Sequence, residues 1–205
     1  MKSHATARRL VLASGNRGKL AEIQALLAPL GAEVCAQSEF DVPEAVEDGD
    51  TFVANALIKA RHAAALTGLP AIADDSGLTV DALGGAPGVL SARYAGEQAS
   101  DAENVDKLLA ALDGVPQAAR AAAFHCAAVF VAAADDSAPL IEEGLWRGRI
   151  LETRHGTGGF GYDPVFFDES AGCAAAEMTQ AQKNGRSHRG LAFRALCAEL
   201  AERWA

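Results

Sequence analysis

The sequence predicts an α/β fold, because segments with strand patterns alternate with segments with helix patterns along the chain. Half of the 205 residues are hydrophobic (50%), which is enough for one sizeable core. No low-complexity linker, internal repeat or long run of charge interrupts the alternation. We therefore expect a single domain over residues 1–205, in which residues 1–8 form a short flexible tail.

The first 70 residues predict two strands and two helices in alternation. These are a strand at Leu10–Ala13, a helix at about Lys19–Leu30, a strand at Ala32–Ala36 and a helix at Phe52–Gly68. Gly31 ends the first helix, and either Asp50 or Thr51 caps the second.

The rest of the chain continues the alternation and adds a hairpin. Ala71–Ala73 predicts a short buried strand that ends at the Asp74-Asp75 pair, and residues 78–83 alternate like its continuation. There follow a helix at about 101–112, strands at 122–133 and 140–151, and a last helix from near Ser187. Because a turn at 135–139 joins the two strands, they are expected to pair antiparallel and to make the sheet mixed.

Composition excludes several classes of protein. The formal net charge of −9 argues against a protein that coats nucleic acid, since that needs a dense basic surface. No apolar run approaches the ~20 residues of a membrane span, and the first residues lack the apolar region of a secretion signal. The four cysteines form no CxxC pair, so structural zinc is not expected. We expect a cytoplasmic protein that binds neither nucleic acid stably nor a membrane.

A candidate phosphate-binding loop, Ser14-Gly15-Asn16-Arg17-Gly18-Lys19, joins the first strand to the first helix. Its glycines let backbone N–H groups approach an anion, and the helix N-terminus and Lys19 supply positive charge. The spacing does not match a P-loop, because two residues separate the glycines and Leu20 follows the lysine. The alternative is that the glycines only shape a turn.

Asp74 and Asp75 follow a buried strand at the edge where open α/β sheets present ligand sites. Adjacent side chains on a strand point to opposite faces, so one of the two is expected to face a ligand. A carboxylate near a phosphate-binding loop is a natural Mg²⁺ ligand. The alternative is a pair of turn-forming residues before Ser76-Gly77.

A second acidic cluster precedes the helix that carries Lys59; its members are Glu44, Glu47, Asp48 and Asp50. Acidic residues at a helix N-terminus complement the helix dipole without a metal, and most helical lysines are solvated. The residues alone therefore favour a helix-capping role here.

The C-terminal third holds a glycine-rich loop and an unusual helix start. Phe160 and Tyr162 flank Gly161, so one ring could stack on a base, an interaction worth ~1–3 kcal/mol; the alternative is a core Phe with a Tyr at the rim. His188 and Arg189, which follow Lys183 and Ser187, oppose the helix dipole at ~0.3–1 kcal/mol per charge. A bound anion or hydrogen-bonding ligand would offset that cost. The alternative is a plain Ser cap with exposed polar neighbours.

Five motifs occur in order: SGNRGK at 14–19, ADDSGLTVDALGGAPG at 73–88, SARYAG at 91–96, GTGGFGYDP at 156–164 and SHRG at 187–190. Together they resemble the non-canonical purine nucleoside triphosphate pyrophosphatases, which act on inosine and xanthosine triphosphates. The resemblance implies an elongated mixed sheet flanked by helices, with two lobes and a central nucleotide-binding cleft, in a homodimer. It also implies Mg²⁺-dependent hydrolysis of ITP, dITP and XTP to the monophosphate and pyrophosphate.

The resemblance also implies a role for each matching residue. Residues Ser14, Gly15, Asn16, Arg17, Gly18 and Lys19 would hold the phosphates, with Lys59 facing them. Asp75 would accept a proton and bind metal together with Glu47, and Ser76 would contact substrate. Lys19, Lys59 and Asp75 are thus the expected catalytic residues. Ala54 stands where many relatives have Glu.

At the other end, the resemblance implies that Phe160, Gly161, Tyr162 and Asp163 form the base-binding loop and that Lys183, His188 and Arg189 contact the nucleotide. Arg189 could donate to the 6-keto oxygen of the purine, where adenine presents a donor instead. Two other functions remain open at this point. One is a nucleoside triphosphate-binding module without turnover, and the other is a phosphatase that releases orthophosphate.

Overall fold

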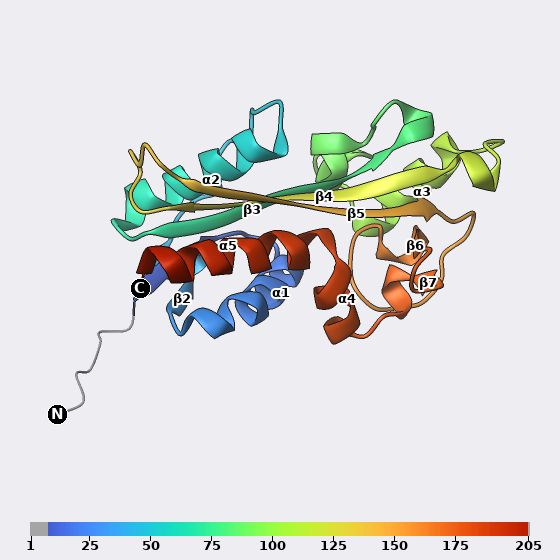
Figure 1. The fold of residues 1–205 in the computed structure, drawn as a ribbon. Helices are drawn as coiled ribbons and strands as arrows, with labels where there is room; N and C mark the ends of the chain where they lie inside the picture. Colours follow the sequence, from blue (N-terminus) through green and yellow to red (C-terminus); the bar gives the residue numbers. More distant parts are fainter. Residues whose placement is uncertain (1–7, 205) are drawn as a thin grey trace. The chain divides into compact units, whose positions relative to one another are not determined.

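The computed structural model describes residues 8–204, with the side chain of Arg17 excepted (Figure 1). Its strands are β1 (Arg9–Ala13), β2 (Glu33–Ala36), β3 (Ala71–Val80), β4 (Ala121–Val131), β5 (Leu140–Ile150), β6 (Phe166–Asp168) and β7 (Cys173–Ala174). Its α-helices are α1 (Arg17–Leu27), α2 (Phe52–Thr67), α3 (Asp101–Ala111), α4 (Gln180–Arg186) and α5 (His188–Trp204). The tail expected at residues 1–8 lies, but for Arg8, outside the described residues.

The strands form one seven-stranded sheet in the order β2-β1-β3-β4-β5-β6-β7. β1 pairs parallel with β2 and β3, whereas β6 pairs antiparallel with β5 and β7. The predicted mixed α/β sheet with flanking helices is therefore confirmed. No helix in residues 8–204 has both the length and the apolarity to span a bilayer.

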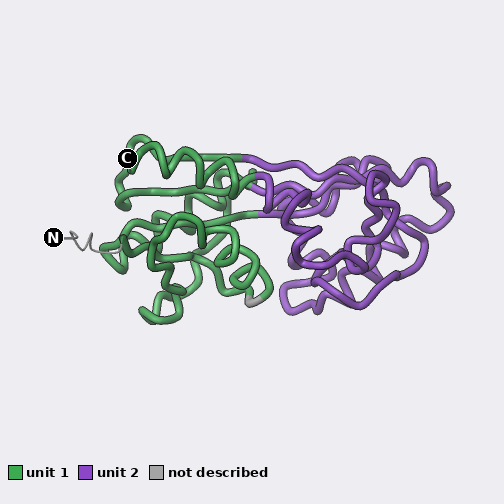
Figure 2. Tube along the Cα trace, turned by 60° about the horizontal axis from the view of Figure 1, so that its bottom comes forward, with its two compact units in different colours: residues 1–75, 127–142, 192–205 green, residues 76–126, 143–191 purple. Residues whose placement is uncertain are grey.

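The chain divides into two compact units (Figure 2). Of the described residues, unit 1 holds 8–75, 127–142 and 192–204, and unit 2 holds 76–126 and 143–191. Strands β3, β4 and β5 and helix α5 run from one unit into the other.

The core of unit 1 packs α2 against β1, β3 and β4. Alanines 56, 60, 63 and 64 lie on one face of α2 and are buried, so the helix backbone approaches the sheet closely. Of the two expected caps, Thr51 is the one used: its side chain accepts a hydrogen bond from the Ala54 N–H. Gly68 ends the helix with a positive φ of 67°, as expected. Figure 1 shows α2 on one face of these strands, and α1 with the C-terminal part of α5 on the other.

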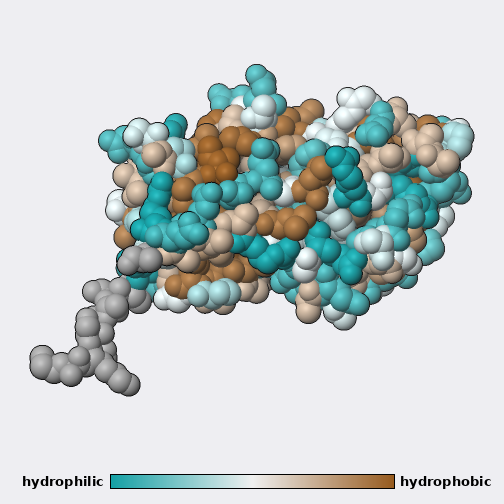
Figure 3. Space-filling model, viewed as in Figure 1, coloured by the Kyte–Doolittle hydropathy of each residue, from teal (hydrophilic) through white to brown (hydrophobic). Residues whose placement is uncertain are grey.

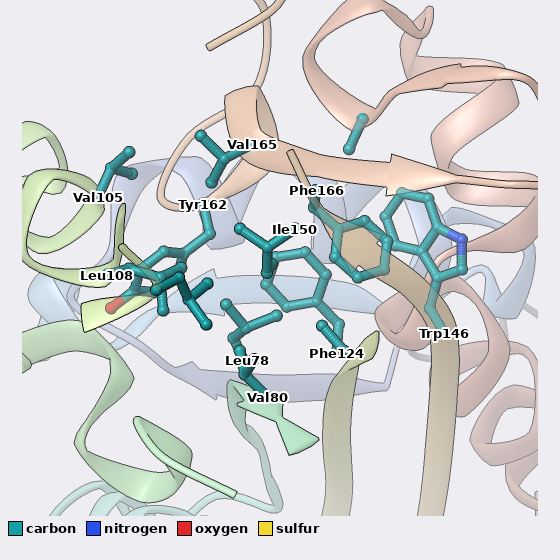
Figure 4. Close-up of a cluster of buried hydrophobic side chains, with 13 residues drawn as sticks. Leu78, Val80, Val105, Leu108, Phe124, Trp146, Ile150, Tyr162, Val165 and Phe166 are labelled. Carbon is teal, nitrogen blue, oxygen red and sulfur yellow. The ribbon is translucent and has the colours of Figure 1, made fainter. Parts of the chain in front are cut away.

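The core of unit 2 is more aromatic (Figure 4). Phe124 of β4, Trp146 of β5 and Phe166 of β6 meet beside Leu78 and Val80 of β3. Tyr162 and Val165 join this cluster from the glycine-rich loop, and this packing anchors the loop to the sheet.

On the face of the molecule drawn in Figure 3, hydrophobic residues lie interspersed among hydrophilic ones.

Strand β3 differs from its prediction. It runs without interruption from Ala71 to Val80, so Asp74 and Asp75 lie inside the strand rather than at its end, and both are buried. The alternative of a turn before Ser76-Gly77 is therefore wrong. The reason is that β3 lies between β1 and β4 in the sheet, and lysines from elsewhere in the sequence compensate the two carboxylates. The short elements α4, β6 and β7 had no sequence prediction.

Candidate active site

The predicted phosphate-binding loop connects β1 to α1 in unit 1. Asn16 caps the helix, because its side chain accepts a hydrogen bond from the Lys19 N–H at 3.0 Å, while its own N–H donates to Ser14 Oγ at 3.3 Å. A Cβ at Gly15 would meet the carboxylate of Glu44, the far end of a flexible side chain, which would have to shift. Gly18 lies in the first turn of α1. The side chain of Arg17, predicted to bind phosphate, lies outside what the structure describes.

Lysines and carboxylates from α1, α2, β3 and the segment before α2 meet in unit 1. Lys19 Nζ of α1 lies 3.4 Å from Asp74 Oδ2 of β3. Lys59 Nζ of α2 lies 2.9 Å from Asp75 Oδ1 and 3.1 Å from Glu47 Oε2. We name these five residues the lysine–carboxylate cluster. The structure thus brings Lys19, Lys59, Asp75 and Glu47 together in unit 1. Glu47 pairs with Lys59, so its carboxylate does more than complement the dipole of α2, and Lys59 is not simply solvated.

The electrostatics of the cluster favour a basic carboxylate. Burial raises the pKa of Asp75, and the nearby ammonium groups of Lys59 and Lys19 offset this only partly. Burial by itself would lower the pKa of Lys59, but Asp75, Asp74 and Glu47 together raise it. Lys59 therefore stays charged, and Asp75 is a stronger proton acceptor than an ordinary aspartate.

The same cluster could hold a divalent cation. The carboxylates of Glu47 and Asp75 already converge on one cationic atom, Lys59 Nζ. Mg²⁺ is usually bound by one or two carboxylates, with substrate phosphates and waters completing its shell, so this pair fits. Among residues 8–204 no group of three or more His, Cys, Asp or Glu is arranged to hold a metal.

Asn55 is a member of the site that the sequence did not predict. It is buried in α2, and its Oδ1 accepts from the Gly49 N–H at 2.8 Å while its Nδ2 donates to Asp75 Oδ2 at 3.4 Å. It therefore fixes the loop that carries Glu47 and also contacts Asp75. The available signal was an Asn inside a helix, where it forms helix poorly, one turn before Lys59.

Ala54 takes part in the same contact. A Cβ at Gly49 would come within 2.8 Å of the Ala54 Cβ and 2.7 Å of Asn55 Oδ1, so the loop lies directly on the first turn of α2. The small side chain at position 54 is compatible with this close approach.

A second cluster, in unit 2, gathers the residues predicted to bind the base. Lys183 Nζ lies 2.7 Å from Asp163 Oδ2, and both side chains are only 4% exposed. Asp163 Oδ2 also accepts from the Phe160 N–H at 2.8 Å. The Lys183 ammonium lies 4.7 Å from the centre of the Phe160 ring, and the Arg189 guanidinium lies 5.6 Å from it. Arg189 also donates to Ser76 Oγ at 2.9 Å.

The two aromatic residues of the glycine-rich loop have different positions. Tyr162 is buried in the core, its hydroxyl donates to the Ser91 carbonyl at 2.8 Å, and burial raises its pKa. Phe160 is half-buried. The alternative of a core Phe with a Tyr at the rim is therefore wrong, since Phe160 provides the accessible ring. Between them, Gly161 has φ 59° and donates its N–H to Asp101 Oδ2 at 2.7 Å.

The start of α5 combines a serine cap with buried charged residues. Ser187 Oγ accepts from the Gly190 N–H at 3.1 Å, which is the expected cap. His188 and Arg189 are 4% and 2% exposed, so the alternative of exposed polar neighbours is wrong. The His188 ring stacks on Phe124, with ring centres 4.8 Å apart and planes 12° apart.

A candidate phosphate-binding loop together with buried lysines and carboxylates, on a mixed α/β sheet, is typical of the class of proteins that act on anionic ligands. The model of the Ham1 family matches residues 10–199, and the chain belongs to this family.

The comparisons extend over nearly the whole chain. It is 58% identical to the dITP/XTP pyrophosphatase of Vibrio parahaemolyticus over 193 residues, covering 94% of this chain and 96% of that protein. It is also 58% identical to the dITP/XTP pyrophosphatase of Methylococcus capsulatus, with the same coverage. Among solved structures, a HAM1 protein from Coxiella burnetii matches with a TM-score of 0.88 and 51% identity, covering 95% of this chain and 99% of that one. The Staphylococcus aureus Ham1 protein matches with a TM-score of 0.84 and 36% identity, covering 96% and 100%.

Proposed function

We propose that this protein hydrolyses dITP, XTP and ITP to the nucleoside monophosphate and pyrophosphate. The observation that carries the proposal is the convergence of Glu47 and Asp75 on the Lys59 ammonium, at 3.1 and 2.9 Å, in the same unit as the Ser14–Lys19 loop. Relatives at 54–58% identity named dITP/XTP pyrophosphatase support the substrate class.

In this proposal the lysine–carboxylate cluster acts on the triphosphate. The Ser14–Lys19 loop and Lys59 hold the phosphate oxygens and stabilise the charge that develops on the leaving pyrophosphate. Asp75 accepts a proton from the attacking water, whose oxygen bonds to the α-phosphorus as the α–β anhydride bond breaks. Mg²⁺, held by Glu47 and Asp75, would neutralise phosphate oxygens.

The second cluster takes the base. Phe160 offers a ring for stacking, and Lys183 and Arg189 offer donors for the 6-keto oxygen of hypoxanthine or xanthine. Adenine presents an amino group at that position, which would leave buried donors unsatisfied at a cost of about 1–3 kcal/mol each.

Product analysis tests the proposal. Purified protein with Mg²⁺ is incubated separately with dITP, XTP, ITP, dATP and GTP in H₂¹⁸O. The products are separated, and mass spectrometry identifies them and locates the ¹⁸O label. We expect monophosphate and pyrophosphate from the deaminated purines, with the label in the monophosphate, and loss of turnover with EDTA. Diphosphate with orthophosphate would indicate the phosphatase alternative, and binding without products would indicate the binding module; either result would refute the proposal.

We also propose that the chain acts as a cytoplasmic homodimer. The support is the family resemblance. Sedimentation equilibrium measures the mass in solution, and a monomer at micromolar concentration would contradict the dimer. Fractionation of cells that express the native gene tests the location.

A further inference from the structure

Asp168, the last residue of β6, has no role in the proposed chemistry, yet its carboxylate accepts hydrogen bonds from several sides. Oδ1 accepts from the Ser170 N–H at 2.8 Å, the Ser170 hydroxyl at 2.6 Å and the Ala171 N–H at 3.1 Å. Oδ2 accepts from Trp146 Nε1 at 3.0 Å and from Arg186 Nη1 at 3.3 Å. Burial acts to raise the pKa of Asp168, but these hydrogen bonds outweigh it and lower the pKa to about 2. An ionised, nearly buried carboxylate thus links β5, β6 and α4.

The first of these links leads to the His188 ring. The Trp146 indole lies 6.3 Å from it, with planes 17° apart, and Phe124 lies against it at 4.8 Å and 12°. Figure 4 shows Trp146 packed beside Phe166 with its nitrogen turned away from the apolar cluster. The bond from that nitrogen to Asp168 therefore fixes the rotation of the indole, and the indole together with Phe124 fixes the plane of the imidazole.

The second link leads to the backbone before His188. Arg186 is the last residue of α4, and one residue separates it from the first residue of α5. Its guanidinium is bound to Asp168 and also donates to Ser170 Oγ at 3.1 Å. Charge-assisted hydrogen bonds of this kind are about twice as strong as neutral ones. The chain is thus held immediately before the residue whose ring the indole orients.

We propose that Asp168 is a positioning residue that fixes His188 from two directions, through the Trp146 ring and through Arg186. The inference rests on the proposed function, in which His188 contacts the nucleotide. Asp168 itself touches no substrate. Its loss would let the imidazole rotate and would weaken recognition of the base while leaving the cleavage step intact.

A double-mutant cycle tests whether Asp168 acts through His188. Asp168→Asn keeps the size of the side chain, but its NH₂ group replaces one of the two accepting oxygens. It therefore faces either the donors of Trp146 and Arg186 or those of Ser170 and Ala171, and the hydrogen bonds on that side are lost. We expect the KM for dITP to rise about tenfold with kcat changed less than about twofold. In a His188→Ala background the same substitution should change the KM less than about twofold. If Asp168 acts through the His188 ring, its loss has little further effect once that ring is absent, so the two substitutions are not additive. Glu169→Gln, which removes the neighbouring exposed carboxylate, is the matched control and should leave the KM unchanged.

A second readout does not depend on turnover. The His188 Cε1–H resonance, assigned by its loss in His188→Ala, senses the ring currents of Phe124 and Trp146. We expect Asp168→Asn to shift it and Glu169→Gln to leave it in place. If Asp168→Asn does not fold, Arg186→Met removes the other donor to Asp168 Oδ2 without changing the rings around His188, and it carries the same two expectations.

Two results would overturn the positioning role: a KM cost that persists in full in the His188→Ala background, or an unmoved His188 resonance. A wild-type protein that fails to turn over dITP would refute the proposed function instead, and the resonance would still decide the role of Asp168.

Discussion

The substitution Asp75→Asn is expected to stabilise the metal-free protein while it abolishes turnover. Burial raises the pKa of Asp75, and Lys59 and Lys19 offset this only partly. The folded state therefore binds the carboxyl proton more tightly than the unfolded state does. By linkage, ionisation of Asp75 at neutral pH costs folding free energy, and a neutral amide of the same shape removes that cost. The new NH₂ group faces the Asn55 Nδ2 donor, so only the long 3.4 Å hydrogen bond to Asp75 Oδ2 is lost, and the amide oxygen still accepts from Lys59.

The structure also indicates that the Asp75→Asn substitution leaves neither nearby lysine without a carboxylate partner. Lys59 keeps Glu47 at 3.1 Å, and Lys19 keeps Asp74 at 3.4 Å. We therefore expect a net gain of about 1 kcal/mol, which lies within the range that single stabilising substitutions commonly give. For a chain of 205 residues this corresponds to a rise in Tm of about 2–4 °C. Turnover should fall by about 10²–10⁴-fold, because the proton acceptor is lost.

Calorimetry in EDTA measures the gain, since EDTA keeps Mg²⁺ from stabilising the wild type alone. The gain should be largest at pH 7 and should shrink as the pH falls toward about 4, where the wild-type carboxyl takes up its proton. Asp74→Asn is the matched control: the same change one residue earlier removes the fully buried carboxylate that pairs with Lys19, and it should lower the Tm. A lower Tm for Asp75→Asn at pH 7, or a gain that grows in acid, would refute the reasoning.

Three further substitutions test other contacts. Lys183→Met leaves the Asp163 carboxylate buried without its ammonium and should cost about 3–5 kcal/mol in urea denaturation; a cost below about 1 kcal/mol would contradict the buried pair. Tyr162→Phe removes the 2.8 Å hydrogen bond to the Ser91 carbonyl and should cost about 1 kcal/mol with turnover nearly unchanged, whereas a large rise in KM would place the hydroxyl at the substrate. Asn55→Ala frees the loop that carries Glu47, the proposed metal ligand, so the Mg²⁺ concentration for half-maximal rate should rise about tenfold; an unchanged Mg²⁺ titration would exclude this role.

The elements that the sequence predicts well are those whose signals are local. The helix at 52–67 has an apolar face at helical spacing, a Thr cap before it and a Gly after it, and its observed bounds agree with the pattern. The sequence pattern ends strand β3 at Asp74 because the apolar run stops there. Its continuation depends on neighbouring strands and on lysines from α1 and α2, which no window of adjacent residues contains.

The candidate site divides in the same way. The Ser14–Lys19 loop has a local signature, but the roles of Glu47 and Lys59 follow only from the family resemblance, since acidic residues before a helix and a lysine within one are common. Asn55 has only a weak local signal, an Asn within a helix, and Asp168 has none, because a polar residue indicates a role only once its burial is known. Alternation along the glycine-rich loop does not decide between Phe160 and Tyr162, because a loop has no fixed period.

The charged residues of both clusters are difficult to explain by stability alone. Apolar residues of similar volume usually serve a core as well as a buried ion pair does, and often better by about 1–4 kcal/mol. Yet the pairs Lys59–Asp75 and Lys183–Asp163 are each largely withdrawn from water. These charged groups are already desolvated and oriented before a substrate binds. No reorganisation is then needed during the reaction, so the groups act more strongly on a bound anion. Asp75→Asn discriminates between ligand recognition and plain structure at the first of these pairs: a purely structural ion pair predicts a loss of stability, whereas a proton acceptor held at a cost in folding free energy predicts a gain.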